Sequence, residues 1–249
     1  MHILLKDDFD LYKIMNSGQC FRAVYMGDSL FRFITGRHVL YIRHLEGIHY
    51  EVSCSRYVWN HVWKPYFDLS VNYRDLRKAI DTGNSFLRKA AGYSQGIRIL
   101  RQDPWEMLIT FIISQRKSIP AIRSSVEKLC LACGKEIRTL RETLYTFPTP
   151  AELCRLSMDD LNHCSLGYRS PYIYETAHSI KKEPSLFKDM ALLNDDTLVD
   201  SLMHFPGVGL KVANCTALFG FHRTSLAPVD VWINRVIQEY YHGLNPFAG

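Results

Sequence analysis

The sequence has no long hydrophobic run, and this excludes a helical membrane span. None of its 249 residues belongs to a stretch of about 18 consecutive apolar residues, the shortest length that crosses a bilayer as a helix. The first residues, from Met1 to Asp8, lack the length and order of a secretory signal peptide. Internal repeats and low-complexity tracts are also missing. We therefore expect an intracellular protein with no membrane association.

The sequence also lacks a metal-binding pattern and a disulfide framework. Its ten histidines show no spacing such as His-Glu-x-x-His, and its seven cysteines are an odd number at scattered positions. The lone Cys-x-x-Cys, Cys130 to Cys133, has no second pair, so we interpret it as a helical pair. A chain of 249 residues with 47% hydrophobic residues can bury a core that needs no cross-links.

Positive charge is concentrated in the middle of the chain. The formal net charge is +5, but residues 71–141 contain 14 Lys/Arg and 6 Asp/Glu, a net of +8 that leaves −3 for the remainder. A basic segment of this kind favours a nucleic-acid partner. The alternative is a solvated basic surface.

Hydrophobic periodicity predicts an α+β fold. Aromatic and β-branched residues broken by turns predict an antiparallel sheet in the first part of the chain, with strands over 30–35, 39–43 and 48–53. From Tyr57 onward the pattern becomes helical and stays so. We therefore predict an N-terminal sheet domain over 1–70 and a helical domain over 71–249.

One stretch of the second domain predicts a helix, a tight hairpin and a second helix. Leu198, Leu202 and Phe205 fall on one face of the first helix. The sequence 206–209, Pro-Gly-Val-Gly, cannot continue that helix. A second helix is expected from Leu210 to a glycine stop at position 220. Backbone N–H groups exposed at its start suit a phosphate oxygen.

Lys211 and Asp230 are the candidate chemical groups near this hairpin. Lys211 lies in the first turn of the second helix, where the helix dipole and burial against apolar neighbours would favour the neutral, nucleophilic amine. Cys215, four residues later, lies on the same face. Pro228 is expected to start a further helix with Asp230 in its first turn, where the carboxylate stays ionised. Such a pair can attack and stabilise a positively charged sugar carbon, although a first-turn lysine is more often merely solvated.

The order of these parts resembles a known family of enzymes. Phe-Pro-Gly-Val-Gly-Leu-Lys-Val-Ala followed by Pro-Val-Asp-Val is similar to the motif of the lysine-bearing, bifunctional helix-hairpin-helix DNA glycosylases. Ser-Gly-Gln-Cys-Phe-Arg near the N-terminus resembles a segment of the 8-oxoguanine DNA glycosylase family. The resemblance covers most of the chain, from about residue 11 onward, in four ordered segments: 16–22, 96–120, 165–172 and 205–231.

The resemblance implies removal of 8-oxoguanine opposite cytosine from duplex DNA, by a monomer in the nucleus or nucleoid. Lys211 would displace the base and form a Schiff base, β-elimination would nick the strand, and Asp230 would stabilise the transition state. The carbonyl of Gly18 would accept a hydrogen bond from the N–H that distinguishes 8-oxoguanine from guanine. Cys215 would also contact the base. The implied sheet is of the kind seen in TATA-binding protein.

Further residues are expected to hold the DNA. Tyr168 would wedge into the base stack and Arg169 would face the opposite base. The family's eukaryotic pattern has three asparagines at the turn where this chain has Arg-Lys-Ser, so Arg116 would offer its donors to cytosine or to phosphate. The complete predicted DNA-binding set is Phe205, Gly207, Val208, Gly209, Arg116, Lys117, Tyr168 and Arg169. No cofactor or catalytic metal is expected; the hairpin carbonyls allow a structural cation.

Two other interpretations remain open. The protein could be a non-enzymatic helix-hairpin-helix DNA binder, but binding alone needs neither Lys211 nor Asp230. It could instead be a glycosylase of the same superfamily for another damaged base. Relatives that hold an iron–sulfur cluster usually carry four cysteines after the aspartate, and no cysteine follows Asp230. Alkylpurine glycosylases share the sheet but lack the lysine.

The last seven residues, 243–249, resemble a turn that opens one further helix in the family. Because the helix itself does not follow, we expect that the sequence is truncated.

Overall fold

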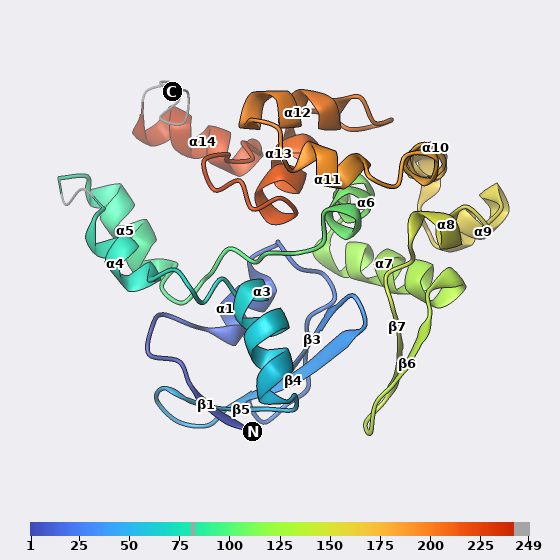
Figure 1. Ribbon diagram of the computed structural model, residues 1–249. Coiled ribbons are helices and arrows are strands. Elements are labelled where there is room, and N and C mark those ends of the chain that lie inside the picture. The colour runs from blue at the N-terminus through green and yellow to red at the C-terminus, as the bar shows by residue number, and fades with distance from the viewer. Residues whose placement is uncertain (81–82, 242–249) are drawn as a thin grey trace.

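The computed structural model describes residues 1–80 and 83–241 and confirms the predicted α+β class. An antiparallel sheet lies at one end and a group of helices lies at the other (Figure 1). The elements of the first part are β1 (His2–Leu4), α1 (Leu11–Asn16), β2 (Val24–Tyr25), β3 (Leu30–Thr35), β4 (His38–His44), β5 (His49–Val52), α2 (Arg56–Val58), a π-helix (Trp59–Trp63) and α3 (Lys64–Tyr66). The elements of the second part are α4 (Tyr73–Lys78), α5 (Ser85–Tyr93), α6 (Pro104–Ser114), α7 (Ile119–Cys133), β6 (Glu136–Arg138), β7 (Thr143–Tyr145), α8 (Pro150–Leu153), α9 (Met158–His163), a 3-10 turn (Gly167–Arg169), α10 (Ser170–Lys182), α11 (Leu186–Met190), α12 (Asp195–Met203), α13 (Leu210–Phe219) and α14 (Val231–Tyr240).

The N-terminal sheet is a five-stranded antiparallel sheet in the order β1-β5-β4-β3-β2. The three strands predicted from the sequence are β3, β4 and β5, with Phe33 opposite Leu40 and Ile42 opposite Val52. An aromatic cluster packs against the sheet: the rings of Phe33 and Phe67 meet edge to face at 5.1 Å, and Trp63 is fully buried. This core explains why the aromatic residues are concentrated before position 70.

The expectation that the chain stays helical after Tyr57 is wrong, because β6 and β7 form a two-stranded hairpin inside the second part. The hairpin extends alongside β3 and β4 (Figure 1). Arg32 of β3 pairs with Glu142 at 2.6 Å, and the Tyr41 hydroxyl lies 2.8 Å from the Thr139 hydroxyl. These contacts cover the second face of the sheet and give nearly continuous burial along β3. The strands are too short for a periodic signal in the sequence.

The second core surrounds α6. Nine of its eleven residues are buried, and α13, α7 and α10 pack around it. Gly220 ends α13 where that helix approaches the start of α6. A Cβ atom added to Gly220 would lie 2.8 Å from the Cα atom of Pro104. Only glycine therefore permits this close packing of α13 on α6.

Arg98 fixes the segment that joins the two cores. Its side chain is fully buried, and it pairs with Asp7 at 2.9 Å. The same guanidinium donates to four backbone carbonyls, those of Phe67, Asp8, Asp68 and Val71. Leu100, two residues later, joins the first core. The chain therefore returns to the sheet domain after α4 and α5, which contain no buried residue themselves.

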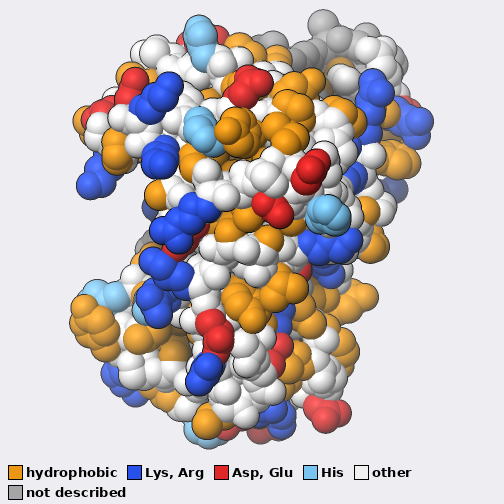
Figure 2. All heavy atoms as spheres, turned by 90° about the vertical axis from the view of Figure 1, so that its right-hand side faces the viewer, with side chains coloured by type: hydrophobic (Ala, Val, Ile, Leu, Met, Phe, Trp, Pro, Cys, Tyr) orange, Lys and Arg blue, Asp and Glu red, His pale blue; other side chains and the backbone are white. Residues whose placement is uncertain are grey.

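The surface is mixed in character. Viewed from the side of α9 and α10, Lys and Arg side chains are interspersed with acidic and hydrophobic ones (Figure 2). Within the described ranges, no helix is long and apolar enough to cross a membrane.

The close approach at Gly220 generates a stability prediction. Gly220→Ala should lower the free energy of unfolding by about 1–3 kcal/mol, because the new methyl group overpacks against backbone atoms. Gly92→Ala is the control: it also lies in helical surroundings, and a Cβ there meets nothing within 4 Å. We expect Gly92→Ala to be neutral or stabilising by about 0.5–1 kcal/mol. Denaturant unfolding measures both, and equal effects would contradict the packing argument.

Candidate catalytic and DNA-binding site

The predicted helix-hairpin-helix is confirmed as α12, a tight turn and α13. Gly207 has φ +73°, and a Cβ there would lie 2.3 Å from the ring of Tyr172 on α10. Gly209 caps α13 in extended backbone without a side-chain hydrogen bond. The first N–H groups of α13 therefore remain available for an anion. Phe205 and Val208 are buried, so they offer DNA their backbone and not their side chains.

Lys211 lies on the wall of a cavity of about 430 Å³ between the end of α6 and the first turn of α13. Arg116, Gly209 and Cys215 line the same cavity. The expected burial of Lys211 is wrong, because its side chain is exposed. Its apolar neighbour Val212 is buried in the core, whereas the Lys211 side chain extends from the first turn of α13 into solvent. The free protein thus presents the amine to solvent at the cavity wall.

Cys215 lies one turn beyond Lys211 and is 4% exposed. Burial raises the pKa of its thiol to about 12; Lys211 opposes this shift and Asp230 adds to it. Cys215 is therefore a neutral thiol at physiological pH. The charges of both Lys211 and Asp230 act on this sulfur, and Lys211 and Cys215 line the same cavity.

Asp230 was expected in the first turn of a helix that starts at Pro228. This expectation is wrong, because α14 begins at Val231 and Asp230 is its N-cap. One carboxylate oxygen accepts hydrogen bonds from the backbone N–H groups of Trp232 and Ile233, each at 2.9 Å. These bonds satisfy free N–H groups at the helix start, as a capping aspartate does. They orient the carboxylate and leave its other oxygen for a ligand.

Gly18 has φ +80°, a backbone conformation that side chains rarely permit. The next residue, Gln19, is buried and fixes this loop: its amide donates to the Arg98 carbonyl at 2.8 Å and accepts from the Leu100 N–H at 2.7 Å. Gln102 donates to the Gln19 carbonyl and, through its own N–H, to the carbonyl of Phe219 at the end of α13. The Gly18 loop is therefore held in a fixed position relative to the helix that carries Lys211.

Gln115 joins three parts of the site, a role that the sequence analysis missed. Its side-chain amide donates to the Gly207 carbonyl at 3.0 Å. Its backbone carbonyl accepts a hydrogen bond from Arg169. The end of α6, the hairpin and the segment 165–172 therefore meet at one residue. A polar residue ending an otherwise apolar helix was the available signal.

Tyr168 and Arg169 lie together but differ in exposure. Tyr168 is 53% exposed, whereas Arg169 is 4% exposed and its guanidinium lies 4.2 Å from the Tyr168 ring centroid. Tyr168 also meets the edge of Tyr172, which packs under the hairpin. The structure thus supports Tyr168 as a protruding ring. Arg169 is directed into the protein toward Gln115, and its contact with an opposite base stays a prediction.

Arg116 and Lys117 also point in different directions. Arg116 is exposed at the cavity and has φ +51°. Lys117 donates to the Ser125 hydroxyl at 2.6 Å and to the Ser165 carbonyl. Burial, followed by the neighbouring charges of Arg169 and Lys128, lowers the pKa of Lys117. Lys117 therefore holds the loop in place, and its contact with DNA stays a prediction.

Two further expectations stay predictions. The hairpin carbonyls of Phe205 and Gly207 already accept hydrogen bonds from Val208 and Gln115, although each carbonyl has a second lone pair for a cation. The predicted terminal turn, 243–249, lies outside the described residues.

Comparison with known proteins identifies relatives of both parts of the chain. Residues 2–108 match the N-terminal domain of 8-oxoguanine DNA glycosylase, and residues 109–245 match the HhH-GPD superfamily of base excision DNA repair proteins. An N-glycosylase/DNA lyase of Saccharomyces cerevisiae is 35% identical over 190 residues, 71% of this chain and 50% of the relative. A probable N-glycosylase/DNA lyase of Methanothermobacter thermautotrophicus is 32% identical over 199 residues, 72% of this chain and 63% of the relative. The chain thus spans about half to two thirds of these relatives.

Solved structures agree with this relationship. The 8-oxoguanine glycosylase/lyase of Clostridium acetobutylicum in complex with duplex DNA containing cytosine opposite 8-oxoguanine is 30% identical, with a TM-score of 0.90 over 99% of this chain and 87% of that one. Its apo form gives a TM-score of 0.92 at 30% identity, over 98% and 85% of the two chains. A 3-methyladenine DNA glycosylase of Archaeoglobus fulgidus, with a TM-score of 0.76 and 19% identity over 98% and 87% of the chains, shares the fold.

The three-way contact at Gln115 generates a second prediction. Gln115→Met keeps the length of the side chain but removes its donor to Gly207, so the free energy of unfolding should fall by about 1 kcal/mol. Affinity for a duplex containing an abasic-site analogue should fall too, because the hairpin is no longer held against α6. Asn60→Met, at an exposed position of the π-helix in the sheet domain, is the control. Wild-type affinity and stability in Gln115→Met would show that the contact does not position the hairpin.

Proposed function

Because the chain belongs to the 8-oxoguanine DNA glycosylase family of the HhH-GPD superfamily, we propose that it excises 8-oxoguanine from duplex DNA and cleaves the strand at the resulting abasic site. The observation that carries the proposal is the position of Lys211. The amine lies at the wall of a cavity, two residues after Gly209, the N-cap residue that offers α13 no side-chain hydrogen bond. A backbone phosphate bound at the open helix terminus would bring the neighbouring sugar to that amine.

In the proposed reaction, the Lys211 amine attacks the anomeric carbon and the C–N bond to the base breaks. The departing base takes the electron pair and, on protonation, leaves as free 8-oxoguanine. Ring opening and loss of a proton give a Schiff base between Lys211 and the sugar. Abstraction of a C2′ proton then expels the 3′ phosphate by β-elimination. A bound duplex would cover the exposed amine and exclude water from it.

Asp230 would stabilise positive charge that develops on the sugar. Its cap hydrogen bonds use one oxygen, so the carboxylate is oriented before the substrate arrives. Preorganised charge of this kind costs no reorganisation during the reaction. Asp230 and Lys211 would thus act from the starts of two helices, α14 and α13.

Recognition of the base would depend on neutral groups. 8-Oxoguanine has an N–H where guanine has a bare ring nitrogen, so the Gly18 carbonyl would attract the lesion and repel guanine. The Cys215 thiol would contact the ring without a negative charge. Extruding the base leaves a gap in the stack, and the exposed ring of Tyr168 is suited to fill it. Exposed Arg116 would offer donors to the orphaned cytosine.

The proposed partner is therefore double-stranded DNA with oxidised guanine opposite cytosine. We further propose that the protein acts as a monomer in the compartment that holds the genome. A structural cation at the hairpin carbonyls is compatible with this function but has no part in the steps above.

The role of Lys211 can be tested by substitution. Lys211→Gln should abolish base release and borohydride trapping on an 8-oxoguanine duplex, because no amine remains to form the Schiff base. Binding to the duplex should stay within about threefold of wild type, since the hairpin N–H groups are unchanged. Lys188→Gln, on α11, is the matched control. Base excision by Lys211→Gln at the wild-type rate would refute the assignment, and binding without any excision by the wild type would favour a non-enzymatic DNA binder.

Asp230 can be tested without disturbing the helix. Asp230→Asn retains the capping oxygen but removes the charge, so base excision should slow by about 10²-fold, the usual size of one electrostatic contribution. Single-turnover excision and the free energy of unfolding separate the two roles. An unchanged excision rate would mean that Asp230 serves only as a cap. A slower rate accompanied by a lower free energy of unfolding would point to a folding defect.

A further inference from the structure

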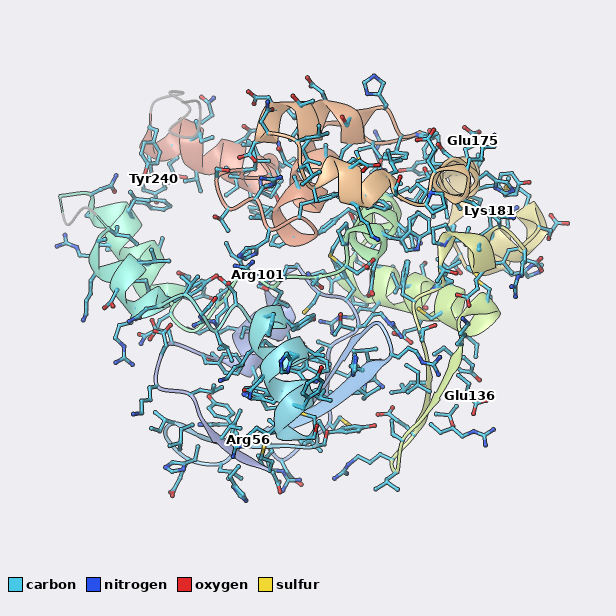
Figure 3. The ribbon with its side chains drawn as sticks, viewed as in Figure 1. Arg56, Arg101, Glu136, Glu175, Lys181 and Tyr240 are labelled. Atoms are coloured by element: carbon cyan, nitrogen blue, oxygen red, sulfur yellow. The ribbon has the colours of Figure 1, made fainter. Side chains whose placement is uncertain are left out.

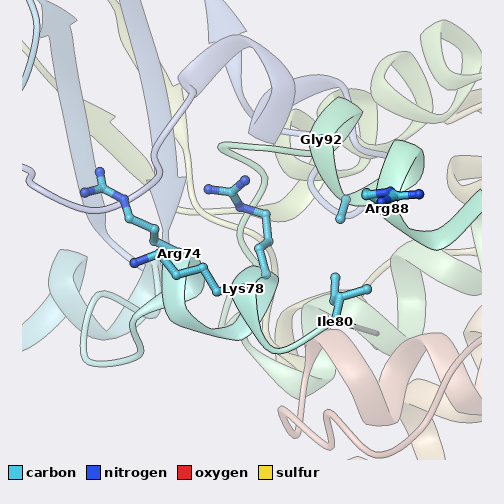
Figure 4. A pocket seen from close by; sticks show the side chains of 7 residues that line it. Arg74, Lys78, Ile80, Arg88 and Gly92 are labelled. Atoms are coloured by element: carbon cyan, nitrogen blue, oxygen red, sulfur yellow. The ribbon is translucent and has the colours of Figure 1, made fainter. Parts of the chain in front are cut away.

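A second basic cleft lies between α4 and α5, away from the catalytic cavity. Its volume is about 360 Å³, and its lining residues include Arg74, Arg77, Lys78 and Arg88. Arg74 and Lys78 lie on one side of the cleft and Arg88 lies on the other (Figure 4). The family resemblance assigned no residue of this cleft.

The cleft has more positive charge than its neighbours neutralise. Asp8 pairs with Arg77 and lies 3.9 Å from Arg74, while Asp75 lies 3.6 Å from Lys78. In the part of the chain that the structure describes, Arg88 has no hydrogen-bond or ion-pair partner. Among the described residues, the four cations that line the cleft form ion pairs with only two carboxylates, those of Asp8 and Asp75. The Lys78–Asp75 pair is largely exposed and contributes little, so both of its groups remain free to exchange partners.

Contacts between α5 and α14 place this cleft relative to the candidate catalytic residues. The rings of Phe86 and Tyr240 stack at 4.2 Å, and Asn84 donates to the Tyr241 hydroxyl at 3.3 Å. Tyr240 extends from the end of α14 toward α5 (Figure 3). Asp230 caps the other end of α14. Because ten helical residues span about 15 Å, the start of α5, where Phe86 meets Tyr240, lies about one helix length from Asp230.

The surface between the two sites carries another exposed cation. Arg235 lies midway along α14, with its guanidinium 4.8 Å from the Trp232 ring centroid. A helix length of about 15 Å corresponds to about four or five base pairs at 3.4 Å each. A duplex bound at Lys211 and extending along α14 would therefore bring backbone phosphates to the cleft.

We propose that the α4–α5 cleft binds backbone phosphates of the DNA on one side of the lesion. The inference rests on the proposed binding of duplex DNA but adds a contact outside the catalytic site. Lys78 and Arg88, which have no strong internal partner, supply the charge. Arg74 and Arg77 hold the cleft against Asp8. The contact contributes affinity without sequence preference, because phosphates carry no sequence information.

The test compares duplexes that do and do not reach the cleft. Each duplex carries a tetrahydrofuran abasic-site analogue with about 12 base pairs on one side and about 3 base pairs on the other. In one duplex the long arm lies 5′ of the analogue and in the other it lies 3′, so only one of the two duplexes extends about 15 Å or more along α14. Removing two phosphate contacts with Lys78→Ala/Arg88→Ala should weaken binding to that one duplex. The loss should be about an order of magnitude per contact at about 0.1 M salt, and the slope of log K against log salt should become shallower by about 1–2. Affinity for the opposite orientation should match wild type.

Arg37→Ala/Arg56→Ala is the matched control, since it removes the same charge from exposed positions of the sheet domain. Equal losses in both double variants would overturn the proposal in favour of a general charge effect. Unchanged affinity of Lys78→Ala/Arg88→Ala for both duplexes would also overturn it. Calorimetry with pyrophosphate distinguishes a DNA-phosphate site from a site for small free anions. A small-anion site would bind pyrophosphate, while the double variant would bind both duplexes as the wild type does. Because the abasic analogue is not processed, absence of 8-oxoguanine excision would refute the proposed function and leave this test intact.

Discussion

The candidate site depends on the hydrogen bonds of Gln115. Its side chain holds the Gly207 carbonyl, and its backbone carbonyl receives the buried guanidinium of Arg169. The largely buried helix α6 is thereby linked to the hairpin and to the segment that presents Tyr168. The hairpin residues 206–209, Pro-Gly-Val-Gly, have no polar side chain with which to hold the turn in place. Tyr172 packs against Gly207 so closely that no Cβ would fit. Rigid placement of Lys211 follows from these contacts.

The free protein keeps several of its basic groups occupied. Lys117 holds the Ser165 carbonyl, Arg169 holds Gln115, and Arg98 holds the segment between the two cores. Arg116 and Arg88 remain exposed. Formal charge in the middle of the chain is therefore a poor guide to DNA contacts. The cations without internal partners are the better candidates, because they lose no protein interaction when they bind a phosphate.

Much of the fold and the candidate pair, Lys211 and Asp230, could be predicted from local sequence. Aromatic and β-branched residues broken by turns predicted β3, β4 and β5. The hairpin at 206–209 followed from proline and glycine, which restrict or free the backbone whatever surrounds them. The short strands β6 and β7 escaped prediction, since three residues carry no periodic signal and their stability comes from contacts with Arg32 and Tyr41.

By itself, the sequence determined the helix-hairpin-helix, the spacing of Lys211 and Asp230, and the glycine at position 18, because each depends on backbone preferences within a few residues. Only the tertiary structure decided which side chains face outward. It exposed Lys211, made Asp230 a cap, buried Arg169 and turned Lys117 toward Ser165. Burial and hydrogen-bond partners depend on segments that are distant in sequence. The local sequence around a lysine or arginine therefore does not tell whether its charged group will bind a carbonyl or face solvent. The basic cleft between α4 and α5 likewise exists only because the fold brings two short helices together.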